Sequence, residues 1–415
     1  ARGAVGAVSD RAGGRRLRRW PWRRLALLAL GVLAVLVAPT GCYLSRAGYE
    51  EARILTRRRA IADVVARGGV DAAARGKLAL VLEARRYAID SLGLDAGRSF
   101  TRYTDIGRDT LLLLLTGARR DRLEPYTWWF PIVGRVPYKG FFDFGMARRA
   151  KADLERRGYD VYLRPSSAFS TLGWFDDPLL NTTLAADSVD LANTVIHEVT
   201  HNEFYAPGQA VFNESFATFV GAHGSARFFA ARGDTASAAQ ARRRWADDQT
   251  LGAFWAALAA SIDSAYAAHP GATPADSARR VAARDTVYGR ARIALVDSVA
   301  PRLLAWGPGQ AAAWARRTQL DNAALLARRT YARELPLFDR VLEREGGDLK
   351  GAIARIIALA RQHAKEPYAG LRAWVDAAGA APPAGPPTMP PTVPPTAPPA
   401  SGARTVPASP DGAVR

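Results

Sequence analysis

The chain of 415 residues has 48% hydrophobic side chains and a formal net charge of +18 at pH 7. That length and composition allow one large domain with a sizeable core plus appendages. Most of the positive charge is arginine mixed with alanine, and no zinc finger, RNA-recognition signature or continuous basic tract follows residue 41, so nucleic acid is not an expected partner. Weak attraction to anionic lipid or cell-wall polymers fits the charge better. The single cysteine excludes intrachain disulfides.

Residues 1–41 predict a signal peptide. Arginines from Arg15 to Arg24 form a basic segment, and an uninterrupted apolar run from Leu25 to Ala38 follows. That run is short for a membrane-spanning helix and typical of the core of a signal peptide. Cys42, directly after Gly41, predicts a bacterial lipoprotein attachment site; an uncleaved signal anchor and a cleaved soluble form are the alternatives. The expected location is the bacterial cell envelope, with the protein exported and anchored to the membrane through its N-terminus.

Residues 42–120 predict a helical N-terminal region, because apolar residues recur at helical spacing, as from Leu78 to Ile89. The pattern changes at residues 126–144, where aromatic residues and valines alternate with glycine and proline and predict a β-hairpin. A short helix from Ala147 to Arg157 and a strand from Tyr159 to Arg164 follow. Together these segments predict a small sheet, whose edge strand could bind an extended peptide by strand addition.

The segment from Ser170 to Leu180 predicts a loop with aromatic and acidic side chains. Two interpretations of these side chains are open. Trp174, Phe175, Asp176 and Asp177 line a cleft beside a functional site, or they are packed aromatic residues and capping aspartates.

The most informative segment is His197-Glu198-Val199-Thr200-His201. Asp187-Ser188 predicts a helix N-cap, and apolar residues then recur at helical spacing until Pro207-Gly208 ends the segment. Two histidines four apart on a helix project from one face and can share a Zn²⁺ ion. Glu198, beside the first histidine, can then act as general base toward a water molecule.

A zinc site of this kind needs a third protein ligand and an open fourth position. The best candidate is Glu214, which follows a Pro/Gly turn at the start of another apolar, helical segment. An antiparallel helix would bring it back to the metal. Glu203 and His223 are the alternatives, the first close to His201 on the same helix and the second reached only by a longer loop.

Residues 224–300 are rich in alanine and arginine and predict helices without a chemical motif. Trp245, Trp255 and Tyr266 in this region are predicted core residues.

The segment from Leu320 to Phe338 belongs to the C-terminal helical part. A zinc peptidase benefits from a side-chain donor that stabilises the tetrahedral oxyanion. Tyr331 and Asn322 are candidates for that catalytic role, against the alternative of helix packing and capping. Residues 381–415 are a proline-rich tail, which is extended and buries no core.

From about residue 42 to residue 370, the sequence resembles the gluzincins, metallopeptidases with an HExxH helix and a later Asn-Glu. More closely, it resembles a bacterial family of predicted zinc-dependent aminopeptidases, many of which are assigned as lipoproteins. The segments that carry the resemblance, besides Gly41-Cys42 and the HExxH helix, occur in the same order along the chain. They are Tyr49 with Glu51-Ala52, Arg86-Tyr87-Ala88, Leu92-Gly93-Leu94, Trp128 with Phe130 to Gly134, Val136 to Phe142, Gly158 to Tyr162, Ser170 to Leu180, Phe212 to Ala217 and Leu320 to Ala323.

The resemblance implies a zinc peptidase with His197, His201 and Glu214 as ligands and Glu198 as base. Two departures bear on exopeptidase action. The chain has no Gly-x-Met-Glu-Asn segment, which in one large group of aminopeptidases holds the free amino end of the substrate. The gap between the second histidine and the third ligand is also shorter than usual.

The predicted fold is α+β and mostly helical, with a zincin-like catalytic core and a small sheet ahead of the HExxH helix. The expected domains are a signal peptide (1–41), a helical N-terminal region (42–120), a metallopeptidase domain with a helical C-terminal part (121–380) and a disordered tail (381–415). The predicted function is a zinc peptidase acting on peptides, with aminopeptidase action expected. The alternatives are an endopeptidase with the same site, and a non-catalytic zinc lipoprotein that acts as a binding module.

Overall fold

The computed structural model describes residues 39–130, 134–166, 178–307, 309–329 and 334–377. Four predicted features lie outside these residues: the signal segment before Pro39, the loop from Trp174 to Asp177, Tyr331, and the tail from residue 381. Cys42 lies within helix α2 (Pro39–Thr56), and its lipidation stays a prediction.

Helices form most of the described chain. They are α2 (Pro39–Thr56), α3 (Ile61–Arg67), α4 (Ala72–Asp90), α5 (Phe144–Arg156), α6 (Asn181–Leu184), α7 (Ser188–Glu203), α8 (Ala210–Ala231), α9 (Thr235–Ala267), α10 (Pro274–Ala294), α11 (Gln310–Arg317), α12 (Asn322–Arg329), α13 (Leu335–Arg344), α14 (Leu349–Gln362) and α15 (Pro367–Asp376), with a π turn (Leu295–Val299) and a 3₁₀ turn (Ala300–Arg302) after α10. Within the ranges that the structure covers, no helix combines the length and apolar character needed to cross a membrane.

The strands are short and form three small sheets among the described residues. They are β1 (Arg59–Ala60), β2 (Arg102–Thr104), β3 (Leu112–Arg119), β4 (Trp128–Phe130), β5 (Gly134–Val136), β6 (Tyr138–Phe141), β7 (Tyr159–Ser166) and β8 (Leu179–Leu180). A mostly helical chain with small sheets ahead of the α7 helix confirms the predicted α+β class at this level.

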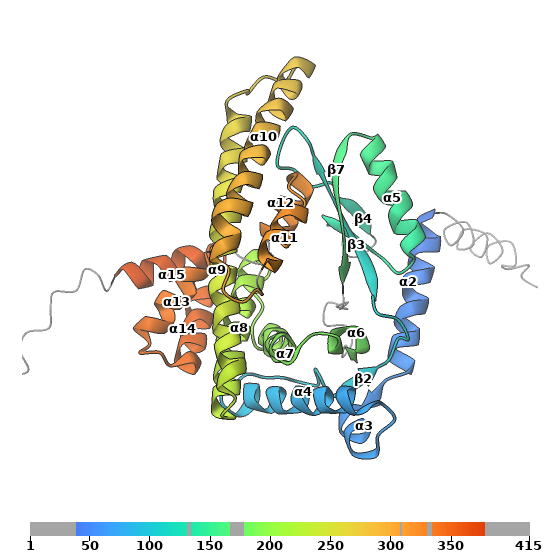
Figure 1. The fold of residues 1–415 in the computed structure, drawn as a ribbon, viewed down its shortest axis with the longest axis vertical. Coiled ribbons are helices and arrows are strands. Elements are labelled where there is room, and N and C mark those ends of the chain that lie inside the picture. The colour runs from blue at the N-terminus through green and yellow to red at the C-terminus, as the bar shows by residue number, and fades with distance from the viewer. Residues whose placement is uncertain (1–38, 131–133, 167–177, 308, 330–333, 378–415) are drawn as a thin grey trace, which may run out of the picture.

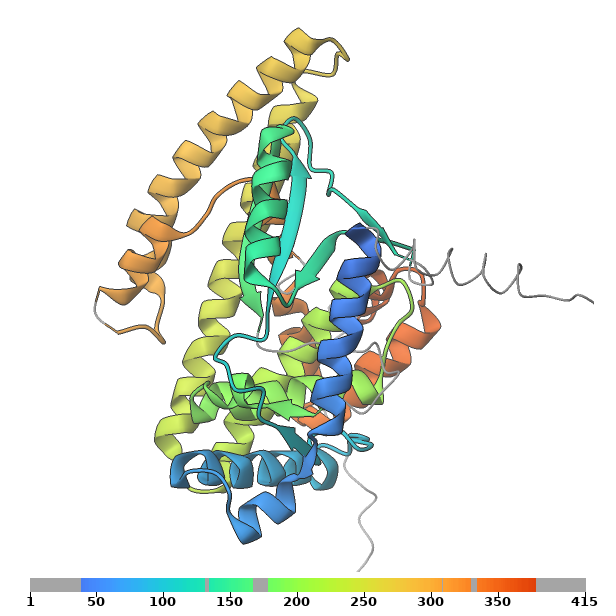
Figure 2. The same cartoon turned by 90° about the vertical axis from the view of Figure 1, so that its right-hand side faces the viewer.

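The antiparallel sheet with strand order β6-β3-β7 has a different helix on each face. On one face, α5 packs against the sheet, and its Leu154 shares a buried cluster with Phe141 of β6 and Val161 of β7. On the other face α12 packs against β3 and β7. Figure 1 shows α5 and α12 on opposite sides of this sheet, and Figure 2 shows α2 and α5 together on its near side. Strand β6 is therefore an edge strand with two distinct faces.

The prediction that residues 42–120 are helical is wrong at the end of this region, where β3 forms the central strand of the sheet. Leu111 to Leu115 is a continuous apolar run, which periodicity alone does not distinguish from a buried helix. The run is continuous because helices cover both faces of the strand and leave no polar side to alternate. The hairpin predicted at 126–144 is confirmed only in part. Strands β4 and β5 pair with each other, whereas β6 pairs with β3.

Helix α7 lies in the main core, packed against α4 and α8. Its inward side carries Leu191, Val195, Ile196 and Val199, all fully buried at 0% exposure. Helix α8 adds an aromatic layer, in which the rings of its phenylalanines pack against Phe338 of α13. The predicted core residues Trp245, Trp255 and Tyr266 are buried as well. Because its apolar side is fixed in this way, α7 presents its polar stripe in one orientation.

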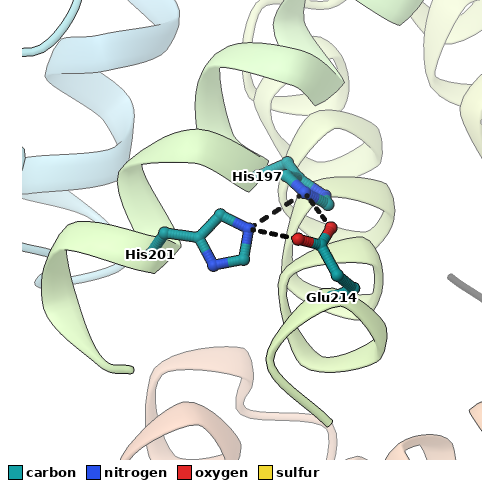
Figure 3. Close-up of side chains that lie close together, drawn as sticks. All are labelled: His197, His201 and Glu214. Carbon is teal, nitrogen blue, oxygen red and sulfur yellow. Dashed lines mark hydrogen bonds and ion pairs between the residues drawn. The ribbon is translucent and has the colours of Figure 1, made fainter. Parts of the chain in front are cut away.

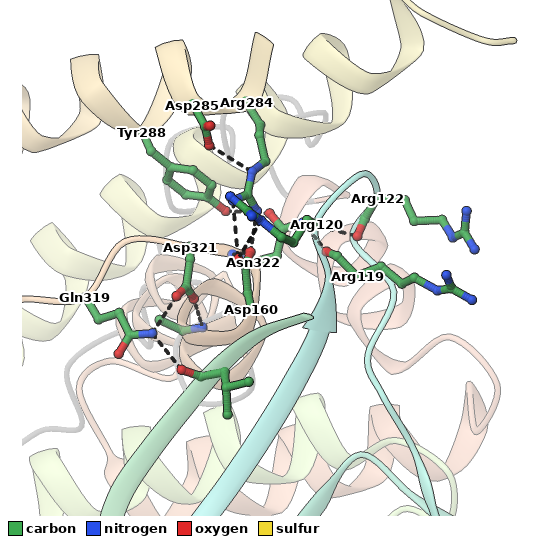
Figure 4. A network of polar contacts seen from close by, with 12 residues as sticks. Arg119, Arg120, Arg122, Asp160, Arg284, Asp285, Tyr288, Gln319, Asp321 and Asn322 are labelled. Carbon is green, nitrogen blue, oxygen red and sulfur yellow. Dashed lines mark hydrogen bonds and ion pairs between the residues drawn. The ribbon is translucent and has the colours of Figure 1, made fainter. Parts of the chain in front are cut away.

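A second buried region joins α10 and α12 to the end of the sheet through polar contacts (Figure 4). The guanidinium of Arg284 in α10 donates two hydrogen bonds to the carboxylate of Asp160 in β7. The backbone N–H of Asn322 donates to the same carboxylate at 3.2 Å. The hydroxyls of Tyr266 and Tyr288 donate to the Asn322 side-chain oxygen at 3.1 and 2.7 Å. These contacts attach the α9–α10 pair to the sheet.

Candidate metal centre

The orientation of α7 is fixed at its first turn. The side chain of Asp187 caps the helix by accepting from the N–H groups of Val189 and Asp190 at 2.9 and 3.0 Å. Arg244 of α9 donates to both aspartates, at 2.5 Å to Asp187 and 2.6 Å to Asp190. Hydrogen bonds from Arg244, together with those from the backbone, lower the pKa of Asp187 to about 2 against the effect of burial. The predicted N-cap is confirmed, and α9 holds it in place.

Three side chains converge on the outward side of α7 (Figure 3). The Nε2 atoms of His197 and His201 lie 3.2 Å apart. The carboxylate of Glu214, from α8, lies 3.4 Å from Nε2 of His197 and 3.7 Å from Nε2 of His201. The three side chains are between 17% and 26% exposed, so the cluster is shielded but open to the surface.

Glu214 reaches the histidines because α8 runs back along α7. The side chain of Asn213, which is 1% exposed, fixes the turn between the two helices. Its amide donates to the Ala206 carbonyl and its oxygen accepts from the Ala206 N–H, both at 2.9 Å. These two hydrogen bonds to the backbone of Ala206 hold the first turn of α8 against the end of α7. The sequence motif contained Asn213, but its positioning role was not predicted.

The protonation states of the cluster suit a cation. Burial, with a smaller effect of the neighbouring His197 ring, lowers the pKa of His201 to about 4, although Glu214 opposes the shift. Burial would raise the pKa of Glu214, but the hydrogen bond from His197 and the interactions with both rings lower it overall. At neutral pH the cluster therefore offers a neutral His201 ring and a carboxylate.

The separations of the three ligand atoms fit zinc. Tetrahedral zinc sites have Zn–N and Zn–O distances of about 2.0–2.2 Å, which places neighbouring ligand atoms about 3.4 Å apart. The three distances in the cluster, 3.2, 3.4 and 3.7 Å, lie around that value. The cluster of His197, His201 and Glu214 is thus able to hold a metal ion with three protein ligands.

Glu198 is exposed and points away from the core of α7. It lines a pocket of about 260 Å³ together with His197, Asp190, Asn193 and Thr194. These residues lie on the same face of α7, between its first turn and the metal-ligand cluster. A water molecule and part of a substrate can therefore reach the cluster beside the Glu198 carboxylate.

The two alternative third ligands are used elsewhere. The Glu203 carboxylate accepts from the Asp95 N–H at 2.9 Å. His223 bonds through Nε2 to Asp339 at 2.8 Å, and Arg227 contacts its Nδ1 at 3.2 Å. The structure leaves both outside the cluster and brings Glu214 into it.

Asn322 does not fit the role of an oxyanion donor. Its side chain is fully buried, and its amide nitrogen donates to the carbonyls of Arg119 and Arg122 at 2.6 and 3.1 Å. Its side-chain oxygen accepts from two tyrosines, as described above. The alternative of packing is therefore correct for Asn322, whereas Tyr331 lies outside the described residues.

Gly221 sets the approach of α8 to α7 directly beside the cluster. A Cβ atom at this position would lie 2.4 Å from Asn193 Oδ1 and 3.2 Å from His197 Cβ. We expect Gly221→Ala to separate the helices, to cost about 1–3 kcal/mol of stability, and to weaken metal binding by the cluster because His197 moves. Chemical denaturation and a zinc titration measure the two effects.

Gly289→Ala is the matched control, because a Cβ atom at Gly289 in α10 meets nothing within 4 Å. It is expected to raise stability by about 0.5–1 kcal/mol. If Gly221→Ala were as stable as the wild type and bound zinc equally well, the two helices would have room that the structure does not show.

A mostly helical α+β protein with a His-His-Glu cluster of the metal-ligand type is the class that fold and site define. A family model described as "Putative aminopeptidase" matches residues 42–371. The match covers most of the chain, which therefore belongs to this family, and a peptidase is the class of activity that the family description supports. Neither a search of curated proteins nor a search of solved structures returns a match.

Proposed function

We propose that the protein is a zinc-dependent peptidase with a zincin-like core, and that it acts on peptides from their free amino end. The convergence of His197, His201 and Glu214 beside the exposed Glu198 is the observation that carries this proposal. Membership of the family described as aminopeptidases supports the direction of attack.

The cluster contributes three protein ligands, which leaves a position open. A zinc ion held there would supply Lewis-acid activation of a water molecule and of the scissile carbonyl. The Glu198 carboxylate accepts the proton of the attacking water and then delivers it to the leaving nitrogen as the C–N bond breaks. Asp187, Arg244 and Asn213 hold the two helices that carry these groups.

A structural zinc site is the rival interpretation of the cluster. Such sites usually close all four positions with protein ligands, often cysteines. Among the described residues the cluster has three members, and a pocket opens next to it. An open site of this kind favours catalysis over a purely structural role.

The test combines zinc content with hydrolysis of two peptides that differ only in N-terminal acetylation. We expect about one zinc per chain and hydrolysis of the free peptide alone. His201→Ala should lose both zinc and activity, since it removes a ligand. His363→Ala, which changes an exposed histidine of the C-terminal region, is the matched control and should keep both.

Each outcome of this test has one meaning. Cleavage of the acetylated peptide would establish an endopeptidase and refute the aminopeptidase assignment. Zinc bound without hydrolysis of either peptide would favour a binding module. Unchanged zinc content in His201→Ala would refute the metal centre.

A further inference from the structure

The peptidase proposed above needs a hydrogen-bond donor for the negative charge that develops on the scissile carbonyl oxygen. Strand β6 carries a candidate on the face that lies toward α7 and α8, the helices of the metal centre. Tyr138 is the first residue of this edge strand and is 46% exposed. No described residue forms a hydrogen bond with its hydroxyl. An exposed phenol without a partner is free to donate to a bound substrate.

Strand alternation fixes the direction in which Tyr138 points. Lys139 lies over the ring of Tyr43 of α2 at 4.1 Å, and Phe141 is buried in the cluster beneath α5. Successive side chains of a strand point to opposite faces. Tyr138 therefore points to the other face of the sheet, away from α2 and α5.

That other face is the one that α12 covers. Tyr138 pairs with Thr116 of β3, and Thr116 pairs in turn with Tyr162 of β7. The guanidinium of Arg328 in α12 lies over the Tyr162 ring at 5.8 Å. Figure 1 shows α8 and α12 on one side of the sheet and α5 on the other. Tyr138 thus extends from the edge of the sheet on the side of the ligand-bearing helices.

The electrostatic environment of Tyr138 agrees with this placement. The half-buried position of the Tyr138 side chain raises its pKa, and the Glu214 carboxylate and Tyr205 raise it further. Glu214 is the proposed third ligand, so Tyr138 lies within electrostatic range of the metal centre. A tyrosine hydroxyl has an ordinary pKa of about 10, so it carries its proton at neutral pH and can donate a hydrogen bond.

We propose that the Tyr138 hydroxyl donates a hydrogen bond to the scissile carbonyl oxygen of the substrate as that oxygen becomes negative. The inference rests on the proposed peptidase function. When the water oxygen bonds to the carbonyl carbon, the π electrons move onto the carbonyl oxygen, where the Tyr138 donor stabilises them. Tyr138 keeps its proton throughout, while Glu198 carries the proton of the water to the leaving nitrogen. This role replaces the one predicted for Asn322.

Tyr205 is the rival donor, because it is 59% exposed and lies near Tyr138. It belongs to the loop between α7 and α8, whereas pairing with β3 fixes the backbone of Tyr138. A donor on a regular element is held more precisely than one on a loop. We therefore assign the role to Tyr138 and use Tyr205→Phe as the matched control.

The test compares Tyr138→Phe with Tyr205→Phe in the zinc-loaded protein. Loss of one oxyanion donor lowers kcat by about 10²–10³-fold, and we expect this loss for Tyr138→Phe with an almost unchanged KM. A phosphinic peptide, whose tetrahedral phosphorus oxygens imitate the charged oxygen, should bind more weakly by a similar factor in calorimetry. Zinc content and thermal stability should equal those of the wild type, and Tyr205→Phe should change none of these quantities appreciably.

An active wild type together with an equally active Tyr138→Phe protein overturns the role of Tyr138 alone, as does a loss that appears only in Tyr205→Phe. Reduced zinc content in Tyr138→Phe overturns it too, because the residue would then support the metal centre. A wild type that binds zinc but hydrolyses neither peptide favours the binding module over the peptidase, and the role of Tyr138 falls with the peptidase.

Discussion

Glu198→Gln is expected to lower kcat by about 10²–10⁴-fold, which is the usual contribution of a general base. In free energy this corresponds to about 2.7–5.5 kcal/mol of barrier. Glutamine has nearly the same size and cannot accept the proton of the attacking water. Glu198 is exposed and is not a member of the metal cluster, so the variant should fold and bind zinc like the wild type.

Single-turnover kinetics of the zinc-loaded variant measure this effect, with zinc quantified in the same sample. Glu203→Gln is the matched control on the same helix. Its side-chain oxygen still accepts from the Asp95 N–H, so activity should stay close to that of the wild type. Turnover at the wild-type rate in zinc-loaded Glu198→Gln would eliminate Glu198 as the base.

The core of the site could be predicted from the sequence because it depends on local geometry. The N-cap at Asp187 placed the start of the helix at Ser188, and Pro207-Gly208 limited its end to a short distance beyond the observed one at Glu203. Two histidines four apart on a helix then share a face without any further information. Glu214 needed only one additional assumption, that the next helix turns back across a short loop.

Other parts of the site depend on contacts between distant segments, which local patterns do not reveal. The apolar run of β3 predicted a helix, since nothing in its own sequence indicates that both of its faces are covered. The direction of Tyr138 follows from the pairing of β6 with β3, and the hairpin that the sequence predicted would have paired β6 with a different strand. The sequence also allowed Asn322 as a donor, because it does not reveal that Tyr266 and Tyr288, from two other helices, bond to the Asn322 side chain.

The second large effect is expected for Asp160→Ala, which should destabilise the protein by about 3–5 kcal/mol, the usual result of removing one partner of a buried ion pair. The side chain of Arg284 is 4% exposed and that of Asp160 is 9% exposed. Burial alone would lower the pKa of Arg284, but the hydrogen bond and charge of Asp160 raise it overall. The substitution leaves a buried guanidinium without its main partner and removes the acceptor for the Asn322 N–H.

Asp285→Ala is the matched control, because Asp285 also bonds to Arg284 but is 55% exposed. An exposed pair contributes about 0–1 kcal/mol, so this variant should unfold close to the wild type. Denaturant midpoints at equal slopes measure the difference between the two variants.

The double change Asp160→Ala with Arg284→Met should recover part of the loss in stability, since it removes the buried charge that has lost its partner. If Asp160→Ala unfolded at the wild-type midpoint, the Asp160–Arg284 pair would not be what attaches α10 to the sheet. A loss of zinc in the folded variant would show instead that this network also supports the metal centre.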